Sequence, residues 1–318
     1  MVAESIAFLG DPDDTVAFRE DVLPARDSRG RFYLPDKNGT AVHVFGANGR
    51  LLTTFGRRGR GPGELSGLRA IYVTAGDSLL VTGSGVVHVF SPHYVQAREY
   101  RNMAGSPDEV ASTIIAGGRL LIDRADHSFA IIDTIGAVTS RVKLREIDES
   151  PCGECGERVY REASMPGSVW SGPLNQYRVE QHDLTGALLQ RFTRNVSWFS
   201  KWSATEIQAN TIAVELGRPR LMGARQSSDG IVWTHITMIE HAGDLTHIDE
   251  DQPRQMAQVW ARVITKIEAI DPAKQQVLAA TTLTNTVFPL VGDYSAQLIV
   301  DDAGGWAWKI LRFRVEQK

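Results

Sequence analysis

The sequence predicts an all-β fold, a six-bladed β-propeller of four-stranded antiparallel blades that spans residues 1–318 as a single domain. Three observations lead to this fold class. Pairs of alternating apolar and polar runs flank short turns rich in Gly, Asn and Asp. This unit recurs at a nearly constant interval, and the last unit lacks a strand that the N-terminal segment can supply.

The clearest unit is Thr40–Leu68. Thr40–Phe45 alternates between two faces, and an Asn-Gly dipeptide in the turn Gly46–Gly49 supplies the positive φ angles of a tight hairpin. A second alternating run follows, and then a basic, glycine-rich segment, Phe55–Leu65. A strand, a turn, a strand and a compact Gly-Pro loop together form one unit of a repeating antiparallel fold.

Degraded copies of the unit follow along the chain, with steps of 45, 42, 50 and 88 residues between the first residues of successive turns. Steps in the forties are typical of four-stranded propeller blades. A shorter strand with Gly or Asp at its start precedes each turn. The turns are Gly46–Gly49, Ser91–Tyr94, Asp133–Gly136, Asp183–Gly186 and Asp271–Lys274; the preceding strands are Gly30–Pro35, Asp77–Thr82, Gly118–Asp123, Gly167–Gly172 and Gly230–His235.

The last unit contains Gln297–Val300 and Trp306–Val315 but no closing strand. We expect Ser5–Leu9 to pair with it and close the ring, which would remove open sheet edges. The 88-residue step could contain an additional blade, so seven blades are the alternative. We favour one enlarged fifth blade with helical insertions at about 203–217 and 251–262, because Ser203–Glu206 fits a capping box and Pro253 suits a first helical turn. Its strands are then about Arg218–Arg225, Gly230–Ile236, Val263–Ile270 and Gln276–Thr281.

Composition is that of an ordinary soluble protein, with 42% hydrophobic residues and a formal net charge of -4. This charge gives no reason to expect nucleic-acid binding. No segment approaches the roughly 20 apolar residues of a membrane-spanning helix. The N-terminus lacks a basic stretch followed by an apolar run, so we expect a cytoplasmic protein that can be peripheral to a membrane. If the chain is a processed, mature form, a periplasmic location is the alternative.

Phe55–Leu65 resembles the inter-blade signature of NHL-type six-bladed propellers, and Asp27–Asp36, Ala41–Leu52 and Ile267–Ala279 resemble the same group of bacterial proteins. The resemblance covers nearly the whole chain. It implies the fold and says little about activity, because propellers carry many functions. Such relatives usually begin with an export or lipoprotein signal. The whole chain is also similar to an extrinsic propeller-type subunit of bacterial photosynthetic reaction-centre–light-harvesting complexes, although no single motif carries that similarity.

We identify no catalytic, cofactor-binding or metal-binding set. Cys152 and Cys155 lack the second pair of ligands that a zinc site needs, and two thiols in a loop, free or disulfide-bonded, are the expectation. His43, His88 and His127 occupy the third strand of three blades, away from the axis, which favours packing. His235, His241 and His247 are irregularly spaced in an expected loop and do not form a ligand pattern.

Two groups of residues are candidates for partner binding. The glycine-rich turn with Arg57, Arg58 and Arg60 could hold an anionic group of a partner protein or lipid, or its glycines could simply allow a tight step between blades. The second group, Trp198, Phe199 and Trp202, lies in an insertion, where aromatic residues either pack on their own blade or contact a partner.

These features favour a non-enzymatic scaffold module, an extrinsic subunit that stabilises a larger complex, which could be membrane-bound and photosynthetic. The expected partners are other protein subunits, with no nucleic acid, no cofactor and no transmembrane segment of its own. Two alternatives remain: a metal-dependent lactonase or lyase with its site on the propeller axis, and a propeller that binds a small molecule or carbohydrate.

Overall fold

The computed structural model confirms an all-β six-bladed propeller. It describes residues 1–10, 16–19, 21–101, 111–123, 128–143, 159–163, 167–173, 175–199, 218–239, 262–300 and 306–316. Within these ranges the chain forms six four-stranded sheets, the blades, and one small two-stranded sheet. The one helical element described is a short 3-10 turn, Ala116–Gly118. No helix in the described part of the chain is long and apolar enough to cross a membrane.

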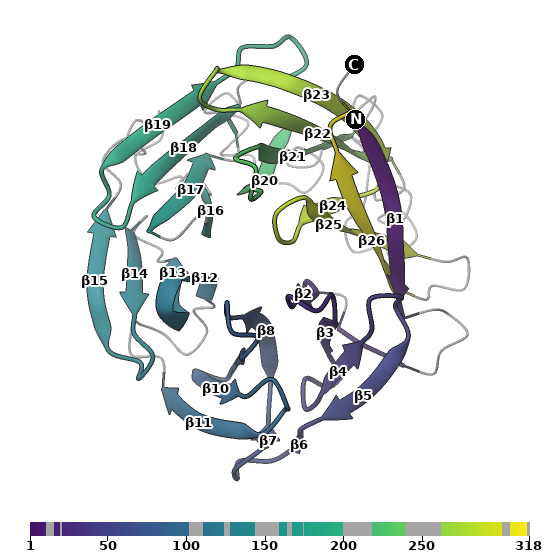
Figure 1. Ribbon diagram of the computed structural model, residues 1–318, viewed down its shortest axis with the longest axis vertical. Coiled ribbons are helices and arrows are strands. Elements are labelled where there is room, and N and C mark those ends of the chain that lie inside the picture. The colour runs from purple at the N-terminus through teal and green to yellow at the C-terminus, as the bar shows by residue number, and fades with distance from the viewer. Residues whose placement is uncertain are drawn as a thin grey trace, which may run out of the picture. The chain divides into compact units, whose positions relative to one another are not determined.

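The blades follow one another along the chain, and in the first five each strand pairs antiparallel with the next (Figure 1). The first contains β2 (Ala25–Arg26), β3 (Phe32–Pro35), β4 (Val42–Phe45) and β5 (Leu51–Phe55), and the second β8 (Leu68–Val73), β9 (Leu79–Gly83), β10 (Val86–Phe90) and β11 (Gln96–Arg101). The third contains β12 (Ala111–Ile115), β13 (Arg119–Asp123), β14 (Ser128–Ile132) and β15 (Val138–Lys143), and the fourth β16 (Val159–Ala163), β17 (Ser168–Pro173), β18 (Arg178–Asp183) and β19 (Leu188–Thr193).

The 88-residue step contains one blade, as expected. It consists of β20 (Arg220–Gln226), β21 (Val232–Ile239), β22 (Val263–Asp271) and β23 (Gln276–Thr284), which match the predicted strands to within a few residues. The predicted helical insertions at about 203–217 and 251–262 lie outside the described residues, as do Trp202, Cys152, Cys155, His127, His241 and His247.

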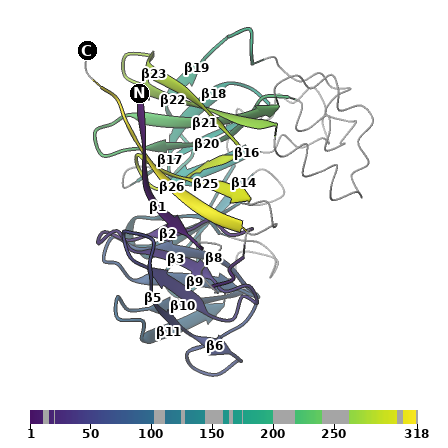
Figure 2. The same ribbon diagram turned by 90° about the vertical axis from the view of Figure 1, so that its right-hand side faces the viewer.

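The sixth blade joins the two ends of the sequence. Its order is β1-β26-β25-β24, with β1 (Val2–Leu9) outermost, followed by β26 (Trp306–Arg314), β25 (Tyr294–Val300) and β24 (Val287–Pro289). β1 and β26 lie side by side in both views (Figures 1 and 2). The expectation that the N-terminal segment completes the last blade is therefore confirmed.

The predicted turns form because their first residues supply the acceptors that a tight turn needs. In Gly46–Gly49 the N–H of Gly49 donates to the carbonyl of Gly46 at 2.9 Å, and Gly49 has φ 83°. In Asp133–Gly136 the Asp133 carboxylate accepts from the N–H groups of Ile135 and Ala137, both at 2.9 Å. Asp183 accepts in the same way from Thr185 and Ala187.

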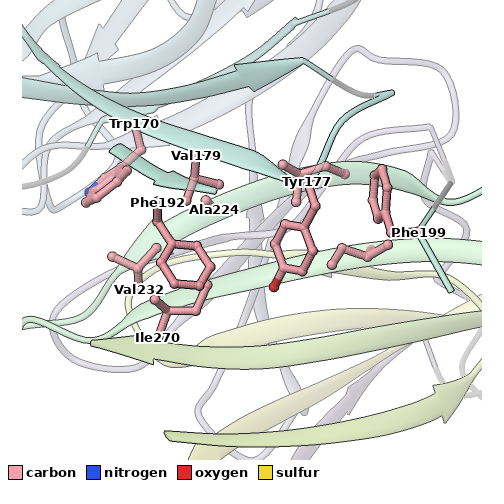
Figure 3. Packing of buried hydrophobic residues seen from close by; sticks show 10 residues of the cluster. Trp170, Tyr177, Val179, Phe192, Phe199, Ala224, Val232 and Ile270 are labelled. Carbon is pink, nitrogen blue, oxygen red and sulfur yellow. The ribbon is translucent and has the colours of Figure 1, made fainter. Parts of the chain in front are cut away.

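The chain divides into two compact units, and each has a core between its own blades. One unit consists of Met1–Ala3, Leu144–Gln297 and Phe313–Lys318, and the other of Glu4–Lys143 and Leu298–Arg312. In the first unit, buried side chains of the fourth and fifth blades pack together (Figure 3). They include Trp170, Tyr177, Val179, Phe192, Phe199, Ala224, Val232 and Ile270.

The second unit has apolar cores between its first and second and its second and third blades. Polar groups also link its first two blades. Arg31 donates to Asp27 and to the Tyr94 hydroxyl, both at 2.6 Å, and Tyr33 donates to Asp27 at 2.8 Å. Asp27 is buried, and the hydrogen bonds from Arg31 and Tyr33 compensate its charge. The Asp77 carboxylate of the second blade also accepts from the Ser28 hydroxyl of the first, at 2.6 Å.

Candidate interaction sites

The basic glycine-rich loop is built around the carboxylate of Glu64. After the first blade the chain forms two short strands, β6 (Arg57–Arg58) and β7 (Glu64–Leu65), which pair in parallel. The Glu64 carboxylate accepts hydrogen bonds from the backbone N–H groups of Arg60 at 3.0 Å and Gly61 at 2.9 Å. The guanidinium of Arg57 reaches the other carboxylate oxygen at 3.1 Å. The N–H of Gly61, with that of Arg60 and the Arg57 charge, holds the pKa of Glu64 below its ordinary value.

An internal carboxylate therefore occupies the position that the sequence suggested for an external anion. The backbone donors of the turn are already used by Glu64, so a phosphate or partner carboxylate would have to displace it to use them. The side chains of Arg57, Arg58 and Arg60 remain exposed, with Arg57 78% exposed. Arg58 and Arg60 form no ion pair with the residues that the structure describes. Guanidinium groups, rather than a backbone nest, are what this loop offers to a partner.

Two features fix the loop. Gly59 leaves no room for a side chain, because a Cβ atom there would lie 1.9 Å from Glu64 Oε2. The N–H of Gly63 donates to the side chain of Gln96 on β11, and Leu65 is fully buried. The glycines thus permit a tight step between blades, one of the two alternatives that the sequence allowed. The same turn leaves the arginine side chains pointing outward.

The predicted aromatic site is divided. Phe199 is 6% exposed and belongs to the core shown in Figure 3, whereas Trp198 is only half-buried. Tyr177 packs against both, with ring centroids 5.9 Å from Trp198 and 5.6 Å from Phe199. The ammonium group of Lys266 lies 4.8 Å from the Trp198 ring centroid, a cation–π contact. Phe199 therefore serves packing, and Trp198 with Lys266 reaches the surface.

A polar network lies beneath these rings. Tyr177 donates a hydrogen bond to the Glu268 carboxylate, and its oxygen lies 3.1 Å from the Thr234 hydroxyl. Arg194 forms an ion pair with the other Glu268 oxygen. Burial, followed by the negative charge of Glu268, raises the pKa of Tyr177 far above its ordinary value, so this hydroxyl remains protonated. The network joins the fourth blade to the fifth, and the Glu268 carboxylate at its centre is 3% exposed.

Two groupings that the sequence did not suggest resemble catalytic sets. Ser171 Oγ lies 3.3 Å from His182 Nδ1, and His182 Nε2 lies 3.8 Å from Glu180. Each of these three side chains is at most 3% exposed. Glu180 is also bound by Arg191 at 2.6 Å and Arg178 at 3.3 Å. Because burial denies a substrate access and the arginines hold the carboxylate, we interpret this grouping as structural.

His235 lies inside β21, within the predicted strand Gly230–Ile236, and not in a loop with other histidines. Its Nε2 is 2.7 Å from the Ser295 hydroxyl of the sixth blade. Burial, followed by the nearby Arg225 charge, lowers the pKa of His235 to about 3. The imidazole is 1% exposed and neutral near pH 7, so this pair also links neighbouring blades.

His43 and His88 lie in the third strands β4 and β10, as expected. His43 is 2.8 Å from the Thr54 hydroxyl, and His88 is 3.4 Å from Glu99. Burial lowers the pKa of both. Among the described residues no three His, Cys, Asp or Glu side chains gather in a way that could hold a metal ion.

The order of the sheets defines the protein as a six-bladed β-propeller, and comparison with solved structures agrees. A member of the DUF4221 family from Bacteroides vulgatus has a TM-score of 0.70 with 11% identity, over 99% of this chain and 98% of that chain. A protein from Bacteroides fragilis has a TM-score of 0.61 with 11% identity, over 99% of this chain and 96% of that chain. Virginiamycin B lyase from Staphylococcus aureus has a TM-score of 0.50 with 9% identity, over 98% of this chain and 99% of that chain.

At these identities the likeness concerns the fold alone. No protein-family model matches the sequence, and no curated protein matches it either.

Proposed function

We propose that this propeller is a non-enzymatic interaction module, an extrinsic subunit that binds other protein subunits through the arginine loop Arg57–Arg60. The observation that carries the proposal is the brace formed by Glu64. It fixes the backbone of the loop while Arg58 and Arg60 remain exposed, without an ion pair to any residue in the described ranges. Because the backbone of the loop is already fixed, less conformational entropy is lost when its guanidinium groups bind carboxylates of a partner.

The half-buried Trp198 with Lys266 is a second contact in this proposal, on the other unit. The buried polar networks support a binding role over catalysis, since the Glu268 and Glu180 carboxylates are buried and each is held by an arginine. No specific observation favours the lactonase or lyase alternative or the carbohydrate-binding alternative. Stoichiometric calcium or zinc in the purified protein would support the former, and a ligand that raises the melting temperature would support the latter.

The finer assignments are part of the same proposal. Membership of the NHL-type group depends on the motifs Phe55–Leu65 and Asp27–Asp36, and a place on a photosynthetic complex would be one form of the extrinsic role. None of the three structural neighbours described above is a protein of either kind. We also propose a location peripheral to a membrane, on the cytoplasmic side or, for a processed chain, in the periplasm.

The test is gentle isolation of the tagged protein from its native source, followed by identification of stoichiometric companions. The same isolation with the double variant Arg58→Glu/Arg60→Glu should lose most of the companion protein. Arg141→Glu is the matched control, because Arg141 is an exposed arginine on another outer strand, β15. A wild-type protein that elutes alone, or a companion retained equally by the double variant, would refute the role of the loop.

A further inference from the structure

The outer strand of the fifth blade has an unusual composition for an exposed edge. β23 (Gln276–Thr284) has the sequence QVLAATTLT, which contains no charged residue in nine positions. It is the outermost strand of its sheet (Figure 1), and its side chains alternate between exposed and half-buried along its whole length. Proteins usually protect a long edge strand with charges, proline or bulges, because an unprotected edge is a template for another strand.

The other outer strands are shorter or charged. β5 has the uncharged sequence LLTTF but only five residues, and Arg50 and Arg57 flank it. The remaining four, β1, β11, β15 and β19, each contain at least one charged residue. β23 is therefore the longest outer strand described and the one long edge without charge.

Its register shows which backbone groups are available. The N–H of Asn285 donates to the carbonyl of Val263, and β22 and β23 pair without a register shift from Ile264–Thr284 to Ala269–Ala279. Bonded and non-bonded residue pairs alternate along an antiparallel ladder. Ala280 and Thr282 consequently lie at non-bonded positions, where both the N–H and the C=O point away from β22.

The edge has a defined length. At one end the Gln297 side chain donates to the Thr284 carbonyl at 2.7 Å, and at the other the ladder is interrupted by a register shift between Ala269 and Ile270 of β22. The free segment is thus centred on Thr281, between Ala280 and Thr282. Leu278, which is 37% exposed, lies just beyond it.

We propose that β23 pairs antiparallel with β23 of a second copy of this chain, about a two-fold axis at Thr281. In this arrangement Ala280 of each copy exchanges both of its outward hydrogen bonds with Thr282 of the other. Leu278 then faces Thr284, and Ala279 faces Leu283, so that a small side chain meets a larger one. A two-fold contact of this kind uses the same surface on both copies and closes on itself.

The absence of charge on β23 favours a second copy of this chain as its partner over a protein of different sequence. In a two-fold strand pair a charge that lies near the axis is brought close to its own copy, and such a like-charge contact is destabilising. β23 has no charge that could meet its own copy, whereas β11 contains Arg98, Glu99 and Arg101. A partner of different sequence would allow, and usually favour, complementary charges on this edge.

The experiment measures the mass of the full-length protein by light scattering after size exclusion, over a wide dilution range. Wild-type protein should show twice the chain mass of 35.0 kDa. Thr282→Lys places an exposed charge beside its own copy and should raise the dimer dissociation constant about tenfold or more. Thr53→Lys is the matched control, since it adds the same charge to the exposed outer strand β5, and it should leave the dimer intact.

A second variant tests the backbone. The N–H of Ala280 points away from β22, so Ala280→Pro removes an edge donor without removing a bond of the ladder to β22. It should give a folded monomer with an unchanged far-ultraviolet circular dichroism spectrum. A wild-type monomer at all concentrations, assemblies larger than a dimer, or a Thr282→Lys dimer as tight as wild type would each overturn the proposal.

Discussion

The hydroxyl of Tyr177, on the fourth blade, donates a hydrogen bond to the carboxylate of Glu268, on the fifth. Arg194 forms an ion pair with the other oxygen of the same carboxylate. The ring of Tyr177 also packs on Trp198 and Phe199, which follow the last strand of the fourth blade. One side chain therefore contacts both the fifth blade and the start of the segment that leads to it.

Tyr177→Phe should destabilise the protein by about 1–3 kcal/mol, since the ring packing is kept but a buried carboxylate loses a donor. Chemical denaturation monitored by tryptophan fluorescence measures the change. Tyr100→Phe is the matched control. The Tyr100 hydroxyl is buried and has no hydrogen-bond partner in the described part of the chain, so its removal should cost nothing. Equal losses in the two variants would contradict the role of the Tyr177–Glu268 bond.

His235 should make stability depend on pH. Its pKa is lowered to about 3 in the folded protein from an ordinary 6.5, so the unfolded chain binds the proton more readily. The contribution is complete above pH 6.5 and is lost as the pH falls toward 3, with a slope of at most about 1.4 kcal/mol per pH unit. Burial lowers the pKa of His43 and His88 in the same direction.

The measurement is the free energy of unfolding between pH 7 and pH 5, a window in which these histidines titrate in the unfolded chain. Replacing His235 with Gln should flatten the profile, because it removes the imidazole that is held neutral against Ser295, Arg225 and the Phe313 ring. A profile of wild-type steepness in His235→Gln would show that the imidazole is not buried as described.

Glu64→Ala should loosen the arginine loop without unfolding the propeller. The substitution removes the acceptor for the Arg60 and Gly61 N–H groups and the partner of Arg57. Trypsin should then cleave after Arg57, Arg58 or Arg60 several times faster, as read by peptide mapping, while the melting temperature stays close to that of wild type. Asp271→Ala is the control, since it also removes a carboxylate that accepts a backbone N–H and pairs with a neighbouring cation, Lys274, outside the loop. Unchanged cleavage in Glu64→Ala would mean that the carboxylate does not brace the loop.

Gly49→Ala should be severely destabilising, by about 3 kcal/mol or more, because a Cβ there would lie 2.1 Å from the backbone oxygen of Phe8 and φ is 83°. Gly167→Ala separates the steric contact from the backbone cost of a positive φ angle. It has φ 100°, but no atom of the described residues lies within 4 Å of the added Cβ, so only the backbone cost of about 1–2 kcal/mol applies. Thermal unfolding of both variants measures the difference, and equal losses would remove the steric argument at Gly49.

The turns and most strands could be predicted because their causes are local. Asp133 and Gly49 each determine a turn through contacts within a few residues. The alternation of apolar and polar side chains identifies the strands on either side. The closing strand could also be predicted, because an unpaired N-terminal segment matched a unit with a missing strand.

The polar links could not be predicted, because their partners are distant in sequence. Glu268 lies 91 positions from Tyr177, and His235 lies 60 positions from Ser295. No spacing rule connects such residues before the blades are packed. The brace by Glu64 is local, and the basic pattern directed attention to arginine side chains rather than to the single acidic residue among them.

The place of β1 outside β26 has a consequence for synthesis. Residues Val2–Leu9 leave the ribosome before the other strands described, yet the strand on which they pack, Trp306–Arg314, leaves after all the others. The first five blades can each form from neighbouring segments as they emerge, but the sixth cannot be completed until nearly the whole chain is made. β1, whose Leu9 side chain is fully buried in the folded protein, therefore waits for its strand partner while all the other blades are synthesised.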